Sequence, residues 1–258
     1  MEIADFSLDA FSLAGRRALV TGGNTGLGQA FTVALARAGA DVFVVSLLDD
    51  DGGTRRLVED AGRTYAETRG DITQPGVPGT IVEQCVEAFG GLDILVNSAG
   101  ICLLADVDDF DRSVWDPMVA VNLTAAFEIA HEASRVMVRQ GSGKIINIAS
   151  LFSWLGGRRS PAYAATKAGI AGFTKAYSDE LAGHGIQVNA IAPGYFATAI
   201  TAATRADADA DRRIVEHIPA GRWGDPADLM GATVFLASSA SDYVNGHLLV
   251  VDGGYLVR

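Results

Sequence analysis

Short runs rich in Val, Ile and Leu alternate with longer segments of helical periodicity along this chain. The short runs are Arg17–Thr21, Asp41–Ser46, Asp93–Val96, Lys144–Ile148, Gln187–Ile191 and Leu248–Val251. The longer segments, with apolar residues three and four apart, are Gln29–Ala38, Val77–Phe89, Arg112–Gln140 and Ala162–Ala182. Strands this apolar are typical of a parallel sheet buried on both faces. The alternation predicts an α/β fold with a doubly wound parallel sheet and helices on both faces.

Composition and charge narrow the classes of function. The net charge of −11 should repel nucleic acid and anionic lipid. No stretch approaches the roughly 18 apolar residues of a membrane helix, and the first residues do not resemble a secretory signal. The two cysteines, at 85 and 102, form neither a disulfide framework nor a metal-binding spacing. We therefore expect a cytoplasmic protein without metal, membrane or nucleic-acid partners.

A glycine-rich turn follows the first predicted strand directly and opens a predicted helix. Its glycines, Gly22, Gly26 and Gly28, permit a tight turn and a close approach to the backbone. The start of the helix presents free N–H groups and a positive dipole end, which suit a pyrophosphate. Such turns are often glycine-rich for packing alone, but the position between strand and helix favours dinucleotide binding.

Three polar side chains are candidates for acid–base chemistry. Tyr163 and Lys167 are four residues apart on a predicted helix and therefore share one face. Ser150 follows the strand Lys144–Ile148, at the edge where a ligand of such a sheet binds. Alone, the Tyr–Lys pair would favour an exposed helix face; beside a dinucleotide turn it favours catalysis. One ammonium about 4–5 Å away supplies about 3–4 kcal/mol, enough to lower a tyrosine pKa from about 10 to 7–8.

These motifs, in this order and spacing, resemble the short-chain dehydrogenase/reductase family over essentially the whole chain. The resemblance rests on Gly22–Gly28, Asn97–Gly100, Ser150, Tyr163 with Lys167, and Pro193–Gly194 with Thr198. It implies a single Rossmann-like domain over residues 1–258, with a cofactor half at about 14–150 and a catalytic and substrate half at about 150–258. It also implies an NAD(P)-dependent oxidoreductase that interconverts a ketone and a secondary alcohol.

The resemblance assigns a role to each candidate residue. Tyr163 is the expected general acid/base, Ser150 hydrogen-bonds the substrate carbonyl, and Lys167 lowers the tyrosine pKa and binds the nicotinamide ribose. Asn122 matches the residue that holds a water linking Lys167 to solvent, although unaided it would pass for an ordinary helix residue. The expected cofactor contacts are Gly22, Asn24, Thr25, Gly26, Leu27, Gly28, Ser46, Asp71, Ile72, Asn97, Ala99, Gly100, Tyr163, Lys167, Pro193, Gly194 and Thr198.

The choice between NAD and NADP depends on the end of the second strand. An acid there binds the ribose 2′-hydroxyl, whereas a base accommodates a 2′-phosphate. Ser46 occupies this position and matches neither pattern. No Lys or Arg lies between Ser46 and Gly53, Asp49–Asp51 would repel a phosphate, and Asn24 in the turn is not basic. The sequence favours NAD over NADP.

Further stretches narrow the resemblance and suggest a substrate. Asn24–Gln29, Ile218–Gly224, Ser241–Tyr243 and Val251–Arg258 resemble the 2-dehydro-3-deoxy-D-gluconate 5-dehydrogenase (2-deoxy-D-gluconate 3-dehydrogenase) group. That group implies a small keto-deoxy sugar acid as the substrate. Candidate substrate contacts are Arg158, Arg159 and Tyr195, because a guanidinium can hold a carboxylate through two hydrogen bonds.

Other functions and the assembly remain open at this point. A sugar or polyol dehydrogenase fits the same motifs. A 3-oxoacyl-(acyl carrier protein) reductase does too, although it would need a basic docking patch and usually NADP. A non-catalytic dinucleotide sensor should have lost the acid–base residue, which is present here. Because members of the family are usually tetramers, we expect a homotetramer.

Overall fold

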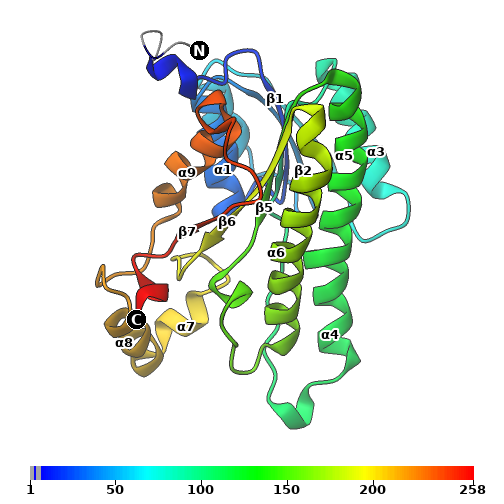
Figure 1. Ribbon diagram of the computed structural model, residues 1–258. Helices are drawn as coiled ribbons and strands as arrows, with labels where there is room; N and C mark the ends of the chain where they lie inside the picture. Colours follow the sequence, from blue (N-terminus) through cyan, green and yellow to red (C-terminus); the bar gives the residue numbers. More distant parts are fainter. Residues whose placement is uncertain (1–2, 4–6) are drawn as a thin grey trace.

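A seven-stranded parallel sheet forms the centre of the computed structural model, which describes residues 3 and 7–258 (Figure 1). The strands are β1 (Arg17–Thr21), β2 (Asp41–Ser46), β3 (Tyr65–Arg69), β4 (Ile94–Asn97), β5 (Gly143–Ile148), β6 (Ile186–Pro193) and β7 (Leu248–Val251). Their order across the sheet is β3-β2-β1-β4-β5-β6-β7. The order reverses between β1 and β4, so the carboxyl ends of these two strands form the topological switch point where ligands bind in such sheets.

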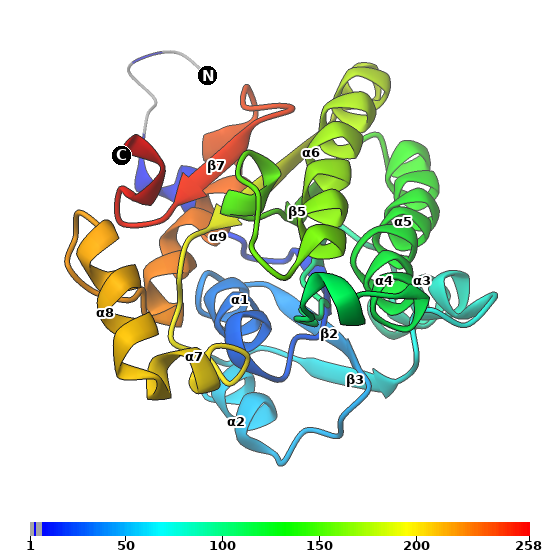
Figure 2. The ribbon, with the colours of Figure 1, turned by 90° about the horizontal axis from the view of Figure 1, so that it is seen from below.

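Helices cover both faces of the sheet. They are α1 (Gly26–Arg37), α2 (Gly53–Glu59), α3 (Val77–Phe89), α4 (Arg112–Val119), α5 (Ala126–Gln140), α6 (Pro161–Leu181), α7 (Ala202–Ala206), α8 (Ala208–His217) and α9 (Met230–Ala237). Short helical turns lie at Leu8–Phe11, Val107–Asp109, Leu151–Ser153, Ala182–His184, Pro226–Leu229, Ser239–Ser241 and Tyr255–Val257, and a π-helical segment at Ala120–Ala125 joins α4 to α5. Helices α1, α2 and α9 pack on one face, and α3 to α6 on the other (Figures 1 and 2).

Apolar cores form on both faces of the sheet as a result of this layering. Successive side chains of a strand point to opposite faces. Val20 accordingly packs with Phe31 and Leu35 of α1, whereas its neighbour Leu19 packs with Ile129 of α5 on the other face. All five of these side chains are fully buried. The expected doubly wound α/β fold is confirmed.

The structure also contains elements that the periodicity did not predict. Strand β3 was not among the apolar runs because, after the buried Tyr65, it alternates partly buried with exposed residues at the sheet edge. The predicted helix over Arg112–Gln140 is interrupted by the π-helical segment around Asn122. Helices α2, α7, α8 and α9 were not predicted either, and no side chain of α7 or α8 is fully buried.

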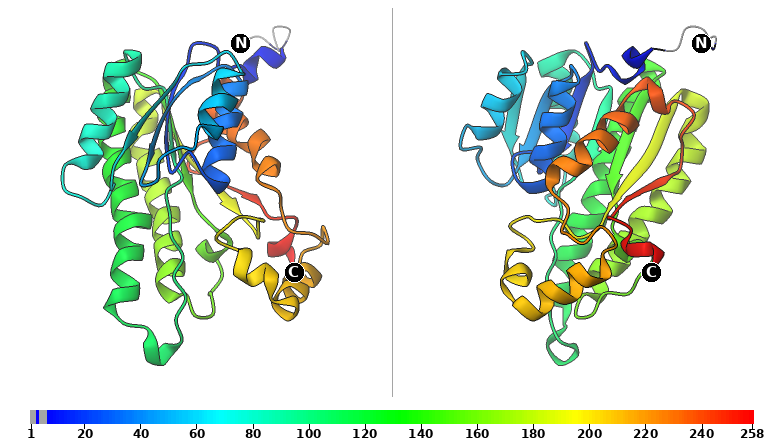
Figure 3. Two further views of the ribbon diagram at one scale, coloured as in Figure 1. Left: turned by 180° about the vertical axis from the view of Figure 1, so that it is seen from behind. Right: turned by 90° about the vertical axis from the view of Figure 1, so that its left-hand side faces the viewer.

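Helices α7 and α8 lie beside the C-terminal turn, at the end of the molecule onto which the carboxyl ends of the strands open (Figure 3). Within the described part of the chain, no helix is long and apolar enough to cross a membrane. Over the same residues, no group of three or more His, Cys, Asp or Glu side chains is placed to hold a metal ion.

Candidate active site

The glycine turn joins β1 to α1 at the switch point of the sheet. A Cβ atom at Gly28 would overlap the carbonyl oxygen of Gly22, and Gly26 has a φ of +53°, so both positions require glycine. Thr25 precedes α1 without a side-chain hydrogen bond to its first turn. The N–H groups at the start of the helix are therefore left for a ligand, as a pyrophosphate site requires.

The glycine turn also contains a buried polar side chain, that of Asn24. Its side chain is only 5% exposed, and its Nδ2 donates a hydrogen bond to the Leu48 carbonyl at 2.6 Å. Among residues 3 and 7–258, no hydrogen-bond partner reaches its buried Oδ1. A buried polar atom without a partner is rare in proteins. The glycine cradle and the N–H groups at the start of α1 are the features that fit a dinucleotide.

Ser150, Tyr163 and Lys167 come together in one cavity with this turn. The cavity is lined by Gly22, Thr25, Gly26, Leu27, Gly28, Ser98, Ala99, Gly100, Ile101, Cys102, Ile148, Ala149, Ser150, Tyr163, Lys167, Pro193, Gly194, Phe196, Thr198, Ala199, Ile200 and Thr201. The Lys167 Nζ lies 5.4 Å from the centre of the Tyr163 ring and donates a hydrogen bond to the Ile148 carbonyl at 2.7 Å. A hydroxyl, a phenol and an ammonium thus share one enclosed space.

Burial dominates the titration of these groups. It raises the pKa of Tyr163 to about 12, while a hydrogen bond with the Ser150 side chain acts in the opposite direction. It also lowers the pKa of Lys167 to about 8. The lowering of the tyrosine pKa expected from Lys167 does not outweigh burial here, and the Lys167 ammonium is instead directed to the Ile148 carbonyl. At neutral pH the phenol therefore carries its proton.

Asn122 lies in the π-helical segment and fixes the loop that follows β4. Its Oδ1 accepts a hydrogen bond from the Ile101 N–H, and its Nδ2 donates one to the Ile101 carbonyl, both at 2.8 Å. A Cβ added at Gly100 would lie 3.3 Å from this Oδ1 and 4.0 Å from the Lys167 Nζ. Asn122 and Lys167 thus flank the same glycine, next to the reactive groups.

The remaining expected cofactor contacts lie around the cavity, but not all of them line it. Ala99, Gly100, Pro193, Gly194 and Thr198 belong to its walls. Those outside the wall are Asn24, Ser46, Asp71, Ile72 and Asn97.

Two of the residues outside the wall are engaged within the protein. The Asp71 carboxylate accepts hydrogen bonds from Thr73 and Gln74, which hold its pKa below the usual range. Asn97 donates to the Ala126 carbonyl and to Asn147, both at 3.0 Å, and so ties β4 to α5 and β5.

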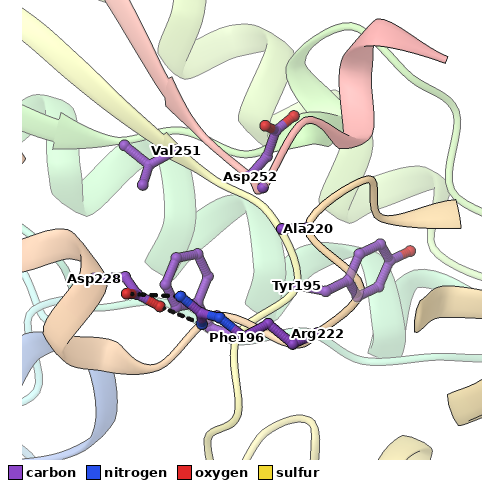
Figure 4. A pocket seen from close by; sticks show the side chains of 9 residues that line it. Tyr195, Phe196, Ala220, Arg222, Asp228, Val251 and Asp252 are labelled. Atoms are coloured by element: carbon purple, nitrogen blue, oxygen red, sulfur yellow. Dashed lines mark hydrogen bonds and ion pairs between the residues drawn. The ribbon is translucent and has the colours of Figure 1, made fainter. Parts of the chain in front are cut away.

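None of the three candidate substrate contacts lines this cavity. Arg159 has a φ of +65°, and its guanidinium is paired with Asp106 at 3.0 Å. Arg158 is exposed. Tyr195 lines a second cavity with Arg222 and Asp228, which are ion-paired (Figure 4). The side chain of Phe196 borders both cavities.

Several wall residues carry no signal that the sequence could have shown. Ile148, Phe196 and Ile200 are apolar and would pass for core residues. Cys102 lines the cavity next to Ile101, and burial raises the pKa of its thiol. Its position two residues after Gly100 is the one hint that it borders the site.

A doubly wound parallel sheet with a glycine turn at its switch point and a Ser–Tyr–Lys cluster beside it defines a nicotinamide-dependent oxidoreductase. Residues 22–256 match the family described as "Enoyl-(Acyl carrier protein) reductase". The chain belongs to the short-chain dehydrogenase/reductase family: it is an NAD(P)-dependent oxidoreductase that acts on CH–OH groups.

Individual relatives are similar along their full length. The chain is 61% identical to YgcW, an uncharacterised oxidoreductase of Escherichia coli (strain K12), over 98% of this chain and 97% of that protein. It is 48% identical to the 2-dehydro-3-deoxy-D-gluconate 5-dehydrogenase of Bacillus subtilis (strain 168), over 97% and 98%. A solved structure from Agrobacterium tumefaciens, described as a candidate 2-deoxy-D-gluconate 3-dehydrogenase with bound NADP, is 47% identical with a TM-score of 0.90, over 97% and 100%.

Proposed function

We propose that this enzyme interconverts a ketone and a secondary alcohol on a keto-deoxy sugar acid such as 2-dehydro-3-deoxy-D-gluconate, with NAD preferred over NADP. The observation that carries the reaction type is the single cavity shared by the glycine turn and by Ser150, Tyr163 and Lys167. The substrate class is supported by the 48% identity to a dehydrogenase of that name over nearly the whole chain.

In the proposed reaction, a bound nicotinamide supplies or accepts the hydride. Tyr163, protonated at neutral pH, donates its proton to the substrate oxygen during ketone reduction. The Ser150 hydroxyl donates a hydrogen bond to the same oxygen and orients it. Lys167, charged below its pKa of about 8, stabilises the phenolate that remains. Asn122 keeps the loop before Cys102 in place beside Lys167 and holds the water that the family implies.

The cofactor contacts follow the shape of the site. Gly22 to Gly28 hold the pyrophosphate against the start of α1. Ser46 meets the adenosine ribose, and Asp71 with Ile72 meets the adenine. Asn97, Ala99 and Gly100 line the middle of the groove, and Pro193, Gly194 and Thr198 lie along the nicotinamide. The NAD preference is supported by the absence of a base between Ser46 and Gly53.

For the substrate carboxylate, Arg158 is the favoured contact. Arg159 is occupied by Asp106, while no acid among residues 3 and 7–258 forms an ion pair with Arg158. Tyr195 precedes Phe196 and lines the second cavity with it. We propose that Tyr195 holds Phe196 in place between the two cavities. Arg158→Gln should raise KM about tenfold for keto acids and leave that for a neutral ketose unchanged.

A 3-oxoacyl-(acyl carrier protein) reductase is the second candidate. It is favoured by Ile200, an apolar side chain that is 66% exposed beside the cavity, and the description of the matched family also names an acyl carrier protein, although for enoyl reduction. The net charge of −11 argues against it, because an acidic carrier would be repelled.

Steady-state absorbance of NADH and NADPH with a substrate panel tests the proposal. The panel contains keto-deoxy sugar acids, neutral ketoses, polyols and a 3-oxoacyl thioester, each with wild type and Tyr163→Phe. We expect the highest kcat/KM for a keto-deoxy sugar acid with NADH, and a loss of about 10²–10⁴ in kcat in the variant with unchanged NADH affinity. A higher kcat/KM for polyols or thioesters would remove the sugar-acid assignment. Tight cofactor binding without turnover would indicate a sensor.

The oligomeric state and the cellular location are also part of the proposal. Phe127, Phe173 and Tyr177 form an aromatic cluster across α5 and α6, and Phe127 is 42% exposed, which supports a homotetramer with these helices at an interface. We propose one functional domain and a cytoplasmic location, supported by the two free cysteines. A stable monomer in light scattering at micromolar concentration would contradict the tetramer.

A further inference from the structure

The edge of the sheet beyond β2 carries an arginine that the sequence alone does not bring near Ser46. Strands β2 and β3 are parallel neighbours, and their last paired residues are Ser46 and Arg69. The Arg69 guanidinium turns toward the loop after β2 and meets Asp49 there, with 3.3 Å between Nη1 and Oδ2. A base therefore stands beside the position that discriminates between NAD and NADP.

The other acids of this loop are directed elsewhere. The Asp50 carboxylate accepts hydrogen bonds from the N–H groups of Thr54 and Arg55, at 3.2 and 2.9 Å. The Asp51 carboxylate accepts one from the Gly53 N–H at 2.8 Å. Both therefore serve the start of α2. Asp49 is the acid of the three that forms an ion pair within the described chain.

Another base of this region, Arg55, is already engaged within the protein. Arg55 pairs with Glu67 at 3.1 Å and with Glu59 at 3.7 Å, and its guanidinium lies 4.7 Å from the centre of the Tyr65 ring. Arg69, by contrast, has a side chain that is 68% exposed, and its ion-pair partner within the described chain is Asp49, whose side chain is 76% exposed. A pair this exposed is weak, so Arg69 can exchange Asp49 for another anion at little cost.

In a doubly wound dinucleotide fold, the adenosine ribose meets the end of the second strand, and an arginine nearby accommodates a 2′-phosphate. An arginine can bind a phosphate through two parallel hydrogen bonds. We propose that Arg69 is the residue that binds the 2′-phosphate of NADP in this enzyme, and that Asp49 weakens this binding by competing with the phosphate for the guanidinium. This inference rests on the proposed function, in that it requires a dinucleotide at the glycine turn.

Calorimetry with 2′,5′-ADP and with 5′-ADP isolates the contribution of the phosphate, and the fluorescence of bound NADPH and NADH repeats the test on whole cofactors. Arg69→Gln should weaken 2′,5′-ADP and NADPH about tenfold and leave 5′-ADP and NADH within about twofold. Asp49→Asn should tighten 2′,5′-ADP and NADPH about fivefold, again with little change for NADH. Arg55→Gln is the matched control and should leave the ratio of the two affinities unchanged.

Equal affinities of wild type and Arg69→Gln for 2′,5′-ADP would overturn the inference and leave the proposed function standing. So would a parallel loss for both cofactors, because Arg69 would then support the adenosine site as a whole. A wild-type protein that binds neither NADH nor NADPH would overturn the proposed function and this inference together.

Discussion

Two stretches border the same cavity and are built on different principles. The glycine turn, residues 22–28, is determined by its backbone: a Cβ at Gly28 would overlap the Gly22 carbonyl oxygen, and one at Gly23 would lie 2.7 Å from the Thr32 Oγ1. The second stretch, residues 194–224, which we propose faces the substrate and call the substrate-side segment, carries α7 and α8, in which no side chain is fully buried. A site formed by backbone binds what all dinucleotides share, whereas exposed side chains can vary with the substrate at little cost to the fold.

The largest effect is expected where the backbone forms the site. Gly28→Ala places a methyl group against the Gly22 carbonyl, so the turn must open and lose its fit to the pyrophosphate. We expect NADH affinity to fall at least about 100-fold, or about 2.7 kcal/mol, when measured by fluorescence titration.

Gly231→Ala is the control for this substitution. Gly231 lies in α9, and an added Cβ there would meet no heavy atom within 4 Å. It should leave NADH affinity unchanged and raise Tm slightly, since alanine favours a helix more than glycine does. If Gly28→Ala bound NADH as tightly as wild type does, the glycine turn would tolerate a side chain at this position. The proposed difference between the glycine turn and the substrate-side segment would then be wrong.

The second effect concerns the buried floor between the two stretches. Burial lowers the pKa of Lys167 to about 8, from about 10.5 in an unfolded chain. Between these values the unfolded chain binds more protons, so the free energy of unfolding should rise with pH. Tyr163 does not oppose this below about pH 10, because its raised pKa acts only above the unfolded value. Lys167 should contribute a gain of about 2–3 kcal/mol from pH 8 to 10, while the thiols of Cys85 and Cys102, whose pKa values burial raises, act in the opposite direction above about pH 9.

Urea unfolding at several pH values measures this gain in wild type and in Lys167→Met. The variant should lack the rise that Lys167 contributes, whatever its absolute stability. Lys144, whose pKa burial also lowers, titrates in both proteins and cancels in the difference. Parallel pH profiles of the free energy of unfolding would show that burial does not lower the pKa of Lys167. The charged Lys167 would then not destabilise the fold.

The same contrast explains what the sequence could predict. Ser150, Tyr163 and Lys167 were found because their spacing and the glycine turn are properties of the chain order, and the structure brings them together. Arg69 was missed because its strand alternates instead of forming an apolar run, and because its nearness to Ser46 arises only when β3 pairs with β2.

The acids after β2 and the apolar residues of the cavity wall show what else the sequence could not predict. Asp49–Asp51 were interpreted as one repelling cluster, although Asp50 and Asp51 bond to the start of α2. Wall residues such as Phe196 follow no pattern at all, because an apolar side chain at a cavity has the same sequence signature as one in a core.

A smaller effect is expected for a substitution that weakens substrate binding through the substrate-side segment and leaves cofactor binding at the glycine turn unchanged. Trp223 donates a hydrogen bond from its Nε1 to Asp211 of α8 at 2.7 Å, and its ring contacts Tyr195. Trp223→Phe keeps the ring contact and loses the hydrogen bond, which is worth about 1 kcal/mol. We expect substrate KM to rise about fivefold, with the NADH dissociation constant within about twofold of wild type. An equal loss for NADH would mean that α8 also supports the cofactor site.

The smallest effect is expected for a side chain that only decorates the substrate-side segment. Arg212 pairs with Asp209 at 2.6 Å on α8, and both side chains are more than 60% exposed. Such pairs contribute about 0–1 kcal/mol, because solvent screens them and two long side chains must be ordered. Arg212→Gln should therefore change Tm by less than about 2 °C and kcat/KM by less than about twofold. If KM rose tenfold for keto acids and stayed unchanged for neutral ketoses, Arg212 would be the carboxylate contact in place of Arg158.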